Sequence, residues 1–463
     1  MMVLTEERYG AAPVLGAATL QDFRNSLHGQ LVLPQDAEYD EVRKVFNAMI
    51  DRRPALIVQC IDTHDVVQSV QFARSHNLPV AMRGGGHSVA GHSMIEGGLL
   101  IDLSLMKNVE VDPVKRIAKA QPGLRLGEYI AETEKWGLVT PTGTASDTGL
   151  AGLALGGGYG WLSGKYGMTV DNILGFEVVT ADGQVLHASE TENADLFWAL
   201  RGGSGNFGVV TSFELKLYMV TEVFGGMLLY PFAMAREVLR FYREVASTAP
   251  DELTTYAALL TAPDGQKMVA ILACYTGSMK EGERVLAPIR EFGPPVVDLM
   301  RPMRYSEVNT LIDEANPQGM QNYWKWNGLK DLPDEAIDAI VDAYARVPSP
   351  RSAILIDQLH GAASRVSPTA TAFAHRDAPH GLVIISLWDD PSEAEVNIAW
   401  TKELAAATEE YSTGGIYVNA EFGDKAHAAF GVNYERLSQI KAKYDPTNFF
   451  RHNQNIKPTV NAG

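Results

Sequence analysis

The chain has 463 residues, enough for two or three domains, and its 39 basic against 56 acidic residues give a net charge of −17. A nucleic-acid partner requires a basic surface, so this balance argues against one. No apolar run reaches the roughly 18 residues of a membrane helix, and the first residues lack a signal-peptide pattern. We therefore expect a cytoplasmic protein with no membrane partner.

The two cysteines, Cys60 and Cys274, are too few for a disulfide framework and show no metal-ligand spacing. Each lies in a mostly apolar run. We expect both to be buried free thiols, and we expect no metal site.

The first third of the chain predicts short strands alternating with helices. Apolar residues at helical spacing predict a helix over 40–50, and Thr63 is a plausible N-cap of a second helix. A third helix is predicted over 126–136. Strands are predicted over 55–60, 78–82, 99–103 and 117–120. The strand over 78–82 leads directly into a glycine-rich turn.

That turn is Arg83-Gly84-Gly85-Gly86-His87-Ser88. Glycines permit positive φ and close approach to a bulky ligand, and successive exposed N–H groups suit a pyrophosphate. His87 adds a nucleophilic nitrogen at the edge of this site, so the turn suggests a cradled and covalently attached cofactor. A tight turn with a surface histidine is the alternative reading of these residues alone.

Two more glycine-rich segments follow, at 149–160 and 201–208. The first matches neither a P-loop nor a dinucleotide-binding fingerprint, but its small residues allow backbone to lie against a flat ligand. The second precedes a strand over 209–217. Between them, strands over 173–180 and 185–188 flank an Asp-Gly pair and predict a hairpin. Repeated glycine turns are hard to explain as connectors alone.

After residue 218 the sequence predicts strands alternating with helices, typical of an antiparallel sheet backed by helices. The predicted strands cover 225–230, 254–260, 268–275, 353–359 and 382–388, and the helices cover 233–247, 281–292, 334–346 and 392–410. The aromatic run Tyr323-Trp324-Lys325-Trp326 is either a packed patch or a substrate wall. His375-Arg376-Asp377 is interpreted as a structural polar cluster, because no nucleophile accompanies it.

The tail after residue 410 is turn-rich and polar. A helix is predicted over 426–444, ending before Pro446. Amide side chains then gather at Asn453, Gln454 and Asn455, where they suit the edge of a polar ring system.

At this point the chain resembles the berberine-bridge-enzyme-like flavin oxidases of the vanillyl-alcohol-oxidase superfamily. The matching residues are 83–88, 155–160, 166–167, 171–172, 196–203, 206–210, 417–419 and 444–455. The resemblance covers about residues 40 to 458, and the ordered set is more specific than any single motif. It implies an α+β fold with a bipartite FAD-binding domain (1–218 and 411–463) around an inserted substrate domain (219–410).

The resemblance also implies FAD as cofactor, bonded through its 8α-methyl carbon to His87. Many relatives form a second bond through a cysteine, but the corresponding position here is Ala145, so we expect a single bond. The first turn would hold the pyrophosphate, and Val209 would approach the isoalloxazine. The cofactor-binding residues expected from the turns and the resemblance are Arg83, Gly84, Gly85, Gly86, His87, Ser88, Gly149, Gly152, Gly156, Gly157, Val209, Asn453 and Asn455.

The resemblance identifies the catalytic residues less directly than the cofactor-binding residues. Many relatives carry a tyrosine after Tyr-x-Asn, but here Tyr417-Val418-Asn419 is followed by Ala420 and Glu421. Tyr417, Glu421 or Lys325 is therefore expected to act, or hydride transfer needs no strong base.

The expected function is an FAD-linked oxidase that takes a hydride from a C–H bond beside a hydroxyl or amine of a small molecule. Electrons would pass to dioxygen. The alternatives are a dehydrogenase with another acceptor and a flavin-binding protein whose activity has decayed. By resemblance, the residue just after Gly149 lies near the oxygen-reactive face of the flavin. The bulk of Leu150 there would exclude dioxygen and favour another acceptor; the alternative is that Leu150 merely packs against the sheet.

Overall fold

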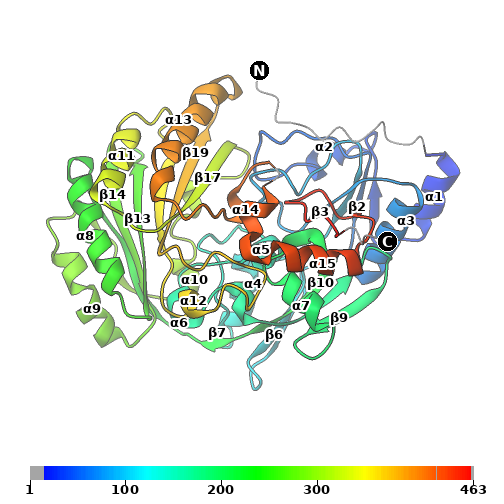
Figure 1. Cartoon of the computed structure of the whole chain (residues 1–463), viewed down its shortest axis with the longest axis horizontal. Coiled ribbons are helices and arrows are strands. Elements are labelled where there is room, and N and C mark those ends of the chain that lie inside the picture. The colour runs from blue at the N-terminus through cyan, green and yellow to red at the C-terminus, as the bar shows by residue number, and fades with distance from the viewer. Residues whose placement is uncertain (1–14, 424, 460–463) are drawn as a thin grey trace.

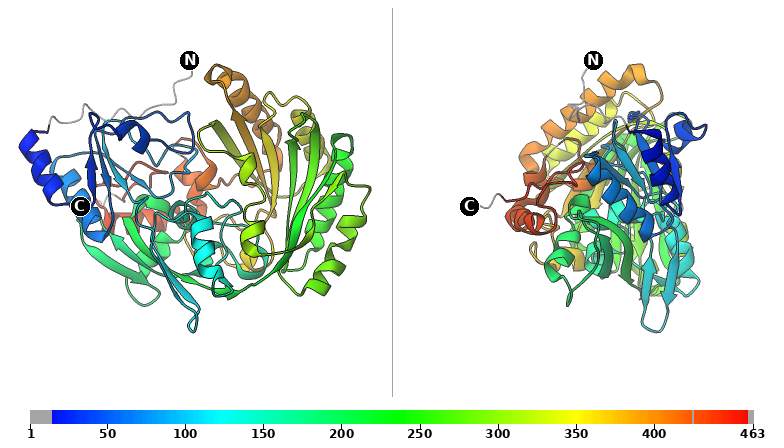
Figure 2. Two further views of the ribbon diagram at one scale, coloured as in Figure 1. Left: turned by 180° about the vertical axis from the view of Figure 1, so that it is seen from behind. Right: turned by 90° about the vertical axis from the view of Figure 1, so that its right-hand side faces the viewer.

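The computed structural model describes residues 15–423 and 425–459. Two halves are visible in Figure 1: strands and glycine-rich loops from the first half of the chain, and a large sheet with helices on its outer face. The last part of the chain leaves the large sheet and returns to the first half, as Figure 2 shows from behind. Residues 1–14, 424 and 460–463, which the predicted domain ranges include, lie outside the described residues.

The first sheet is small and mostly parallel. Its order is β1-β2-β4-β3, with β2 and β3 both parallel to the central β4. Its strands are β1 (Gln30–Val32), β2 (Leu56–Gln59), β3 (Val80–Arg83) and β4 (Leu99–Asp102). Helices α1 (Ala17–Asn25), α2 (Tyr39–Val42) and α3 (Thr63–Ser75) accompany them. Strand β3 ends at the glycine turn, so the turn lies at the carboxyl edge of the sheet, where ligands bind in such folds.

The second sheet is antiparallel, in the order β5-β6-β10-β8-β9. Its strands are β5 (Val109–Asp112), β6 (Ile117–Ala120), β8 (Ile173–Val179), β9 (Val185–Ser189) and β10 (Val209–Lys216). The predicted hairpin is present as β8 and β9. Helices α4 (Leu126–Glu134) and α7 (Ala194–Leu200) pack against its strands, and α5 (Leu150–Gly156) and α6 (Ser163–Tyr166) lie between them in the chain. Strand β7 (Leu138–Val139) pairs with β11 (Tyr218–Met219).

The third sheet is the large antiparallel one, in the order β15-β12-β14-β13-β18-β19-β17, with β16 paired to β12. Its strands are β12 (Val223–Pro231), β13 (Leu253–Thr261), β14 (Lys267–Tyr275), β15 (Val297–Asp298), β16 (Arg301–Met303), β17 (Gln321–Leu329), β18 (Ala353–Gln358) and β19 (His380–Trp388). Its helices are α8 (Ala235–Thr248), α9 (Met279–Glu291), α10 (Tyr305–Val308), α11 (Asp334–Ala345), α12 (Gly361–Arg365) and α13 (Ala394–Ala407).

Side chains of this sheet alternate between two environments, as the period of two along a strand requires. Ile354 and Ile356 of β18, and Leu382 and Ile384 of β19, join the apolar core beneath α8, α11 and α13. Their neighbours face the opposite side, toward the first half of the chain. The helices on the outer face are visible at the left of Figure 1.

Two predicted helices differ from the structure, and the strand that carries the aromatic run was not predicted. The helix expected over 40–50 ends at Val42, because the following backbone bonds to distant segments: Phe46 N–H donates to Gly86 O and Ala48 N–H to Met320 O. The helix expected over 426–444 is split into α14 (Ala426–Phe430) and α15 (Tyr434–Tyr444) at Gly431, whose φ is +46°. Strand β17, which carries the aromatic run, was not predicted as a strand.

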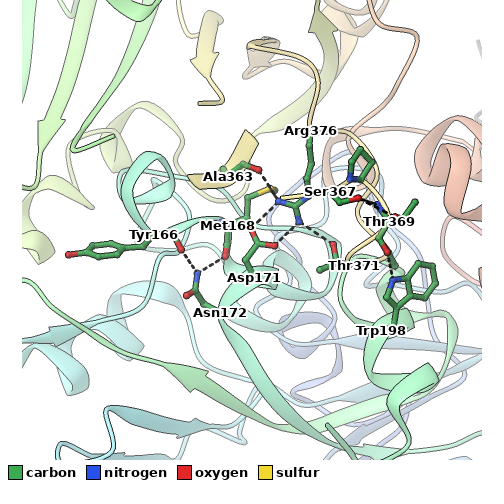
Figure 3. Close-up of polar contacts among 12 residues, drawn as sticks. Tyr166, Met168, Asp171, Asn172, Trp198, Ala363, Ser367, Thr369, Thr371 and Arg376 are labelled. Atoms are coloured by element: carbon green, nitrogen blue, oxygen red, sulfur yellow. Dashed lines mark hydrogen bonds and ion pairs between the residues drawn. The ribbon is translucent and has the colours of Figure 1, made fainter. Parts of the chain in front are cut away.

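A buried ion pair fastens the loop before β19 to the first half of the chain (Figure 3). Arg376 donates to both oxygens of Asp171, at 2.6 and 3.0 Å, and also to Thr371 Oγ1 and Ala363 O. The Arg376 side chain is 1% exposed. The 375–377 segment therefore contains a structural cluster, as the sequence predicted.

A second buried pair fixes the start of the glycine turn, and its loss provides a test. Arg83 Nε and Nη2 donate to the two oxygens of Asp102, at 3.0 and 2.5 Å, and the Asp102 side chain is fully buried. Replacing Arg83 by alanine leaves an unpaired buried carboxylate, so we expect a loss of about 3–5 kcal/mol in urea unfolding. Lys135→Ala, which breaks an exposed pair with Glu132, is the control. Equal stability of the two variants would contradict the expectation.

Candidate functional site

A cavity of about 340 Å³ lies between the glycine-rich loops and the inner face of the large sheet. Its wall combines three parts of the chain: the loops of the first half, strands β13, β17, β18 and β19, and the returning tail. At one end the wall is glycine and backbone, and at the other it is aromatic and aliphatic. The two ends suit two different ligands.

The glycine end depends on a contact between two backbones far apart in sequence. A Cβ at Gly85 would lie 2.5 Å from Gly149 Cα, and a Cβ at Gly149 would lie 2.7 Å from Gly85 N. A Cβ at Gly84 would lie 2.7 Å from Pro122 O. Of the three glycines in the turn, only Gly86 has positive φ, at +72°. The first two are therefore required for close packing rather than for a left-handed conformation.

His87 lies in the cavity wall, with its ring stacked on Phe46 at a centroid distance of 3.9 Å. Its Nε2 is 3.5 Å from Asp147 Oδ1, too long for a good hydrogen bond. Burial raises the pKa of Asp147, but His87 and Arg125 lower it more, so the carboxylate stays charged. The imidazole is thus packed against Phe46, and its buried Nε2 has no hydrogen-bond partner among the described residues.

Other buried polar atoms of this wall also lack partners. They are His92 Nε2, Ser93 Oγ and Asn453 Oδ1. Burial lowers the pKa of His92 to about 3 and that of His452 to about 4, so both rings are neutral near pH 7. Buried polar atoms are normally satisfied, so these atoms indicate a polar ligand at the glycine end.

The opposite end contains a buried acid among aromatic side chains. Asp357 of β18 accepts a hydrogen bond from the Tyr159 hydroxyl, and both residues line the cavity. Burial raises the pKa of Asp357 to about 7, against a smaller lowering effect of the Tyr159 hydrogen bond. The Tyr256 hydroxyl, also in this wall, is buried without a partner. A carboxyl group with a pKa near 7 is suited to accept a proton.

Tyr417 lies between the two ends. Its hydroxyl accepts hydrogen bonds from Gly158 N–H at 3.1 Å and Asn419 Nδ2 at 3.0 Å. Burial raises the pKa of Tyr417, so the phenol is protonated at neutral pH. With two donors already bound, the hydroxyl can direct its own proton toward a ligand. The predicted residue Tyr417 is therefore placed at the cavity.

Lys325 and Glu421, the other predicted catalytic residues, do not line the cavity. Glu421 is 2% exposed and pairs with both Lys325 and Lys425. Lys325 lies on β17 between Trp324 and Trp326, which line the cavity, so the strand period turns its side chain away from it. The ion pair fastens the tail to the edge strand, and neither side chain reaches the cavity wall.

Most predicted cofactor residues line the cavity: Gly84, Gly85, Gly86, His87, Ser88, Gly149, Gly152, Val209 and Asn453. Arg83 does not, because its side chain is held by Asp102. Gly156 and Gly157 pack instead against Asn419 and Phe373. Asn455 is outside the wall, although its neighbour Gln454 lines it.

Leu150, which was expected to control the access of dioxygen, does not line the cavity. It is the first residue of α5 and is fully buried in the apolar core, whereas its neighbours Gly149 and Ala151 line the cavity.

Sequence reasoning missed Asp357, Tyr159 and Tyr256. Tyr159 stands inside a motif that the sequence analysis quoted, directly after three glycines. Asp357 had one available signal: it is a lone acid after the apolar run Ala353–Ile356 of a predicted strand. A charged residue in an otherwise buried strand is uncommon unless it is paired or functional.

Comparisons with known proteins agree with this geometry. The chain matches the FAD binding domain family over residues 54–189 and the berberine and berberine-like family over residues 416–457. It is 34% identical to an FAD-linked oxidoreductase of Dictyostelium discoideum, covering 96% of this chain and 97% of that protein. It is 30% identical to (R)-6-hydroxynicotine oxidase of Paenarthrobacter nicotinovorans, covering 94% and 97%.

Solved structures are similar over nearly the whole chain. The crystal structure of 6-hydroxy-D-nicotine oxidase from Arthrobacter nicotinovorans matches with a TM-score of 0.86 at 30% identity, over 94% of this chain and 99% of that one. Chitooligosaccharide oxidase matches with a TM-score of 0.84 at 26% identity, over 95% and 100%.

The fold and the cavity define a flavin-dependent enzyme with an FAD-binding domain of the vanillyl-alcohol-oxidase type. The chain belongs to the berberine-bridge-enzyme-like family of FAD-linked oxidoreductases. The unpartnered polar atoms and the glycine contact at one end of the cavity fit that cofactor. Among the described residues, no helix combines the length and apolar character that a membrane span requires.

The raised pKa of Asp357 makes a prediction about stability. The folded protein retains this proton up to about pH 7, whereas the unfolded chain loses it near pH 4, so the group costs stability as pH rises between these values. Asp357→Asn removes that cost. At pH 8 we expect the variant to melt at a higher temperature than the parent and to be more stable by up to about 4 kcal/mol. At pH 4 the two proteins should melt at similar temperatures.

The control is Asp389→Asn, at an exposed carboxylate paired with Arg351. Its effect on melting should be small at both pH values. A parent protein more stable than Asp357→Asn at pH 8 would contradict the burial argument.

Proposed function

We propose that this protein is an FAD-linked oxidase that removes a hydride from a C–H bond beside a hydroxyl or amine of a small molecule. The observation that carries the proposal is the cavity itself, which joins a glycine cradle to a buried acid with a pKa of about 7. When bound, FAD would accept the hydride and pass the electrons to dioxygen, giving hydrogen peroxide.

The residues of the chain then divide into two groups. Gly84, Gly85 and Gly149 hold the dinucleotide by backbone approach, and the stretch at Val209 lines the wall near the flavin ring. Residues 1–218 and 411–463 would form the cofactor domain, with 219–410 supplying the substrate wall. The glycine turn and Asn453, from opposite ends of the chain, share one wall, which supports this division.

Asp357 is the proposed proton acceptor for the substrate hydroxyl or amine. Its carboxylate is held by the Tyr159 hydrogen bond. The Tyr417 and Tyr256 hydroxyls face the same space and can donate to the substrate oxygen or nitrogen. This arrangement supplies a base without the tyrosine that Ala420 replaces.

We propose covalent attachment of FAD through His87 alone. Its buried Nε2 lacks a hydrogen-bond partner and lies in the glycine-end wall, while Ala145 in the same wall offers no sulfur. Both cysteines lie in apolar cores away from the cavity wall, and burial raises the pKa of each thiol. Neither is suited to attack the cofactor.

The proposed reaction is tested by a screen of alcohols and amines, with hydrogen peroxide and product both quantified. One peroxide for each product molecule supports the oxidase. Product formed only with an artificial electron acceptor would establish a dehydrogenase instead.

Variants of the acid test its role with any substrate found. Asp357→Asn should lower kcat/KM by about 10²–10⁴-fold. In the parent, kcat/KM should rise with pH through about 7 as Asp357 loses its proton. Tyr159→Phe removes a hydrogen bond that lowers this pKa, so the rise should move to higher pH. Tyr218→Phe, whose hydroxyl contacts Asn172, is the control. An unchanged pH profile in Tyr159→Phe would count against Asp357 as the base.

Covalent attachment is tested by acid precipitation. Parent protein should remain yellow, and a flavin-sized mass should map to the peptide containing His87 and to neither cysteine. His87→Ala should release its flavin on precipitation, whereas His76→Ala, at the C-cap of α3, should retain it. Flavin released from the parent protein would disprove the covalent bond.

A further inference from the structure

The charge of the cavity wall restricts what the site accepts. Among the described residues that line it, Asp357 is the one carboxylate, and neither lysine nor arginine contributes. Asp357 is 4% exposed, and its side chain accepts a hydrogen bond from the neutral Tyr159 hydroxyl. A buried carboxylate in a protein is normally paired with a cation. Here the wall supplies neither lysine nor arginine, so a cationic ligand would stabilise the charged form of Asp357.

Aromatic rings surround the position where that cation would lie. The rings of Tyr159 and Tyr417 are 5.2 Å apart, and those of Trp326 and Tyr417 are 6.1 Å apart. Trp326 Nε1 and Asp357 Oδ2 lie 2.6 and 3.4 Å from the position that a Cβ at Gly381 would occupy. Acid and indole therefore approach the same point. Aromatic faces attract organic cations, most strongly where water is excluded.

The remaining wall at this end is aliphatic. Leu355 of β18 and Val383 and Ile385 of β19 face the cavity by the strand period. A sugar carries hydroxyl groups around its whole ring, and these aliphatic side chains offer them no hydrogen-bond partner. An anionic substrate would meet an uncompensated carboxylate.

We propose that the substrate is an apolar amine, held as its ammonium ion between Asp357 and the surrounding aromatic rings. The proposal rests on the proposed oxidase function and narrows it to one substrate class. The ammonium group gives a proton to Asp357, and the adjacent C–H bond then breaks with its electron pair passing to FAD. A C=N bond forms, water later hydrolyses the iminium ion to a carbonyl compound and ammonium, and dioxygen takes the two electrons as peroxide.

Binding to the anaerobic holoenzyme is measured by calorimetry with matched probes: benzylamine against benzyl alcohol, and cyclohexylmethylamine against cyclohexylmethanol. Benzoate and cellobiose complete the set. We expect each amine to bind at least about tenfold more tightly than its alcohol, and the last two to give no binding.

Variants test which residues cause the preference for amines over alcohols. Asp357→Asn should weaken amine binding by about tenfold or more and change alcohol binding by less than about threefold. Trp326→Leu should weaken amine binding by about threefold to tenfold. Asp389→Asn is the control. The inference is overturned if an alcohol or cellobiose binds as tightly as the amines, or if the amine preference survives in Asp357→Asn.

Bleaching of the bound flavin is a second measurement, and it separates the proposed amine substrate from the proposed oxidase function. If alcohols or sugars bleach the flavin but amines do not, the proposed oxidase function stands and the proposed amine substrate is overturned. Tight, Asp357-dependent amine binding without bleaching by any probe keeps the ligand class and counts against the oxidase.

Discussion

The contact between the backbones of Gly85 and Gly149 is the constraint on which the cavity depends. Each glycine occupies the space that a side chain on the other would need, so both positions must lack a Cβ at once. The contact brings the turn after β3 against the start of α5, and it places His87, Ala145 and the α5 backbone around one space. Because the contact is between backbones, it is rigid, and the geometry of the glycine end does not rely on flexible side chains.

The other end of the cavity follows from the two faces of one sheet. The same strands that bury Ile354, Ile356 and Ile384 beneath helices turn Leu355, Asp357 and Ile385 toward the first half of the chain. Burial of Asp357 raises its pKa, and this costs folding stability while it brings the titration of the carboxyl group close to neutral pH. The Arg376–Asp171 pair fixes the loop before β19 to the first half, so the sheet and the glycine cradle keep their relative position.

The local patterns were the predictable part of this molecule. Hairpin β8–β9, five strands of the large sheet and the glycine turn were all predicted from short-range signals, and the family resemblance supplied the α+β architecture. The helix expected over 40–50 failed because Phe46 and Ala48 bond to Gly86 and Met320, contacts that no local pattern encodes. Lys325 and Glu421 seemed available for chemistry because sequence cannot show that one neutralises the other. Asp357 was missed because its surroundings include three tyrosines that the fold brings together from separate parts of the chain.

The returning tail has a consequence for how the protein is made. His452, Asn453 and Gln454 line the same cavity as the glycine turn, yet they are synthesised long after it. Until these residues emerge from the ribosome, they cannot complete the wall. The glycine cradle can fold early, but the pocket closes only once this later segment is available. Truncation before residue 452 therefore removes part of the pocket wall, although every strand of the three sheets precedes it.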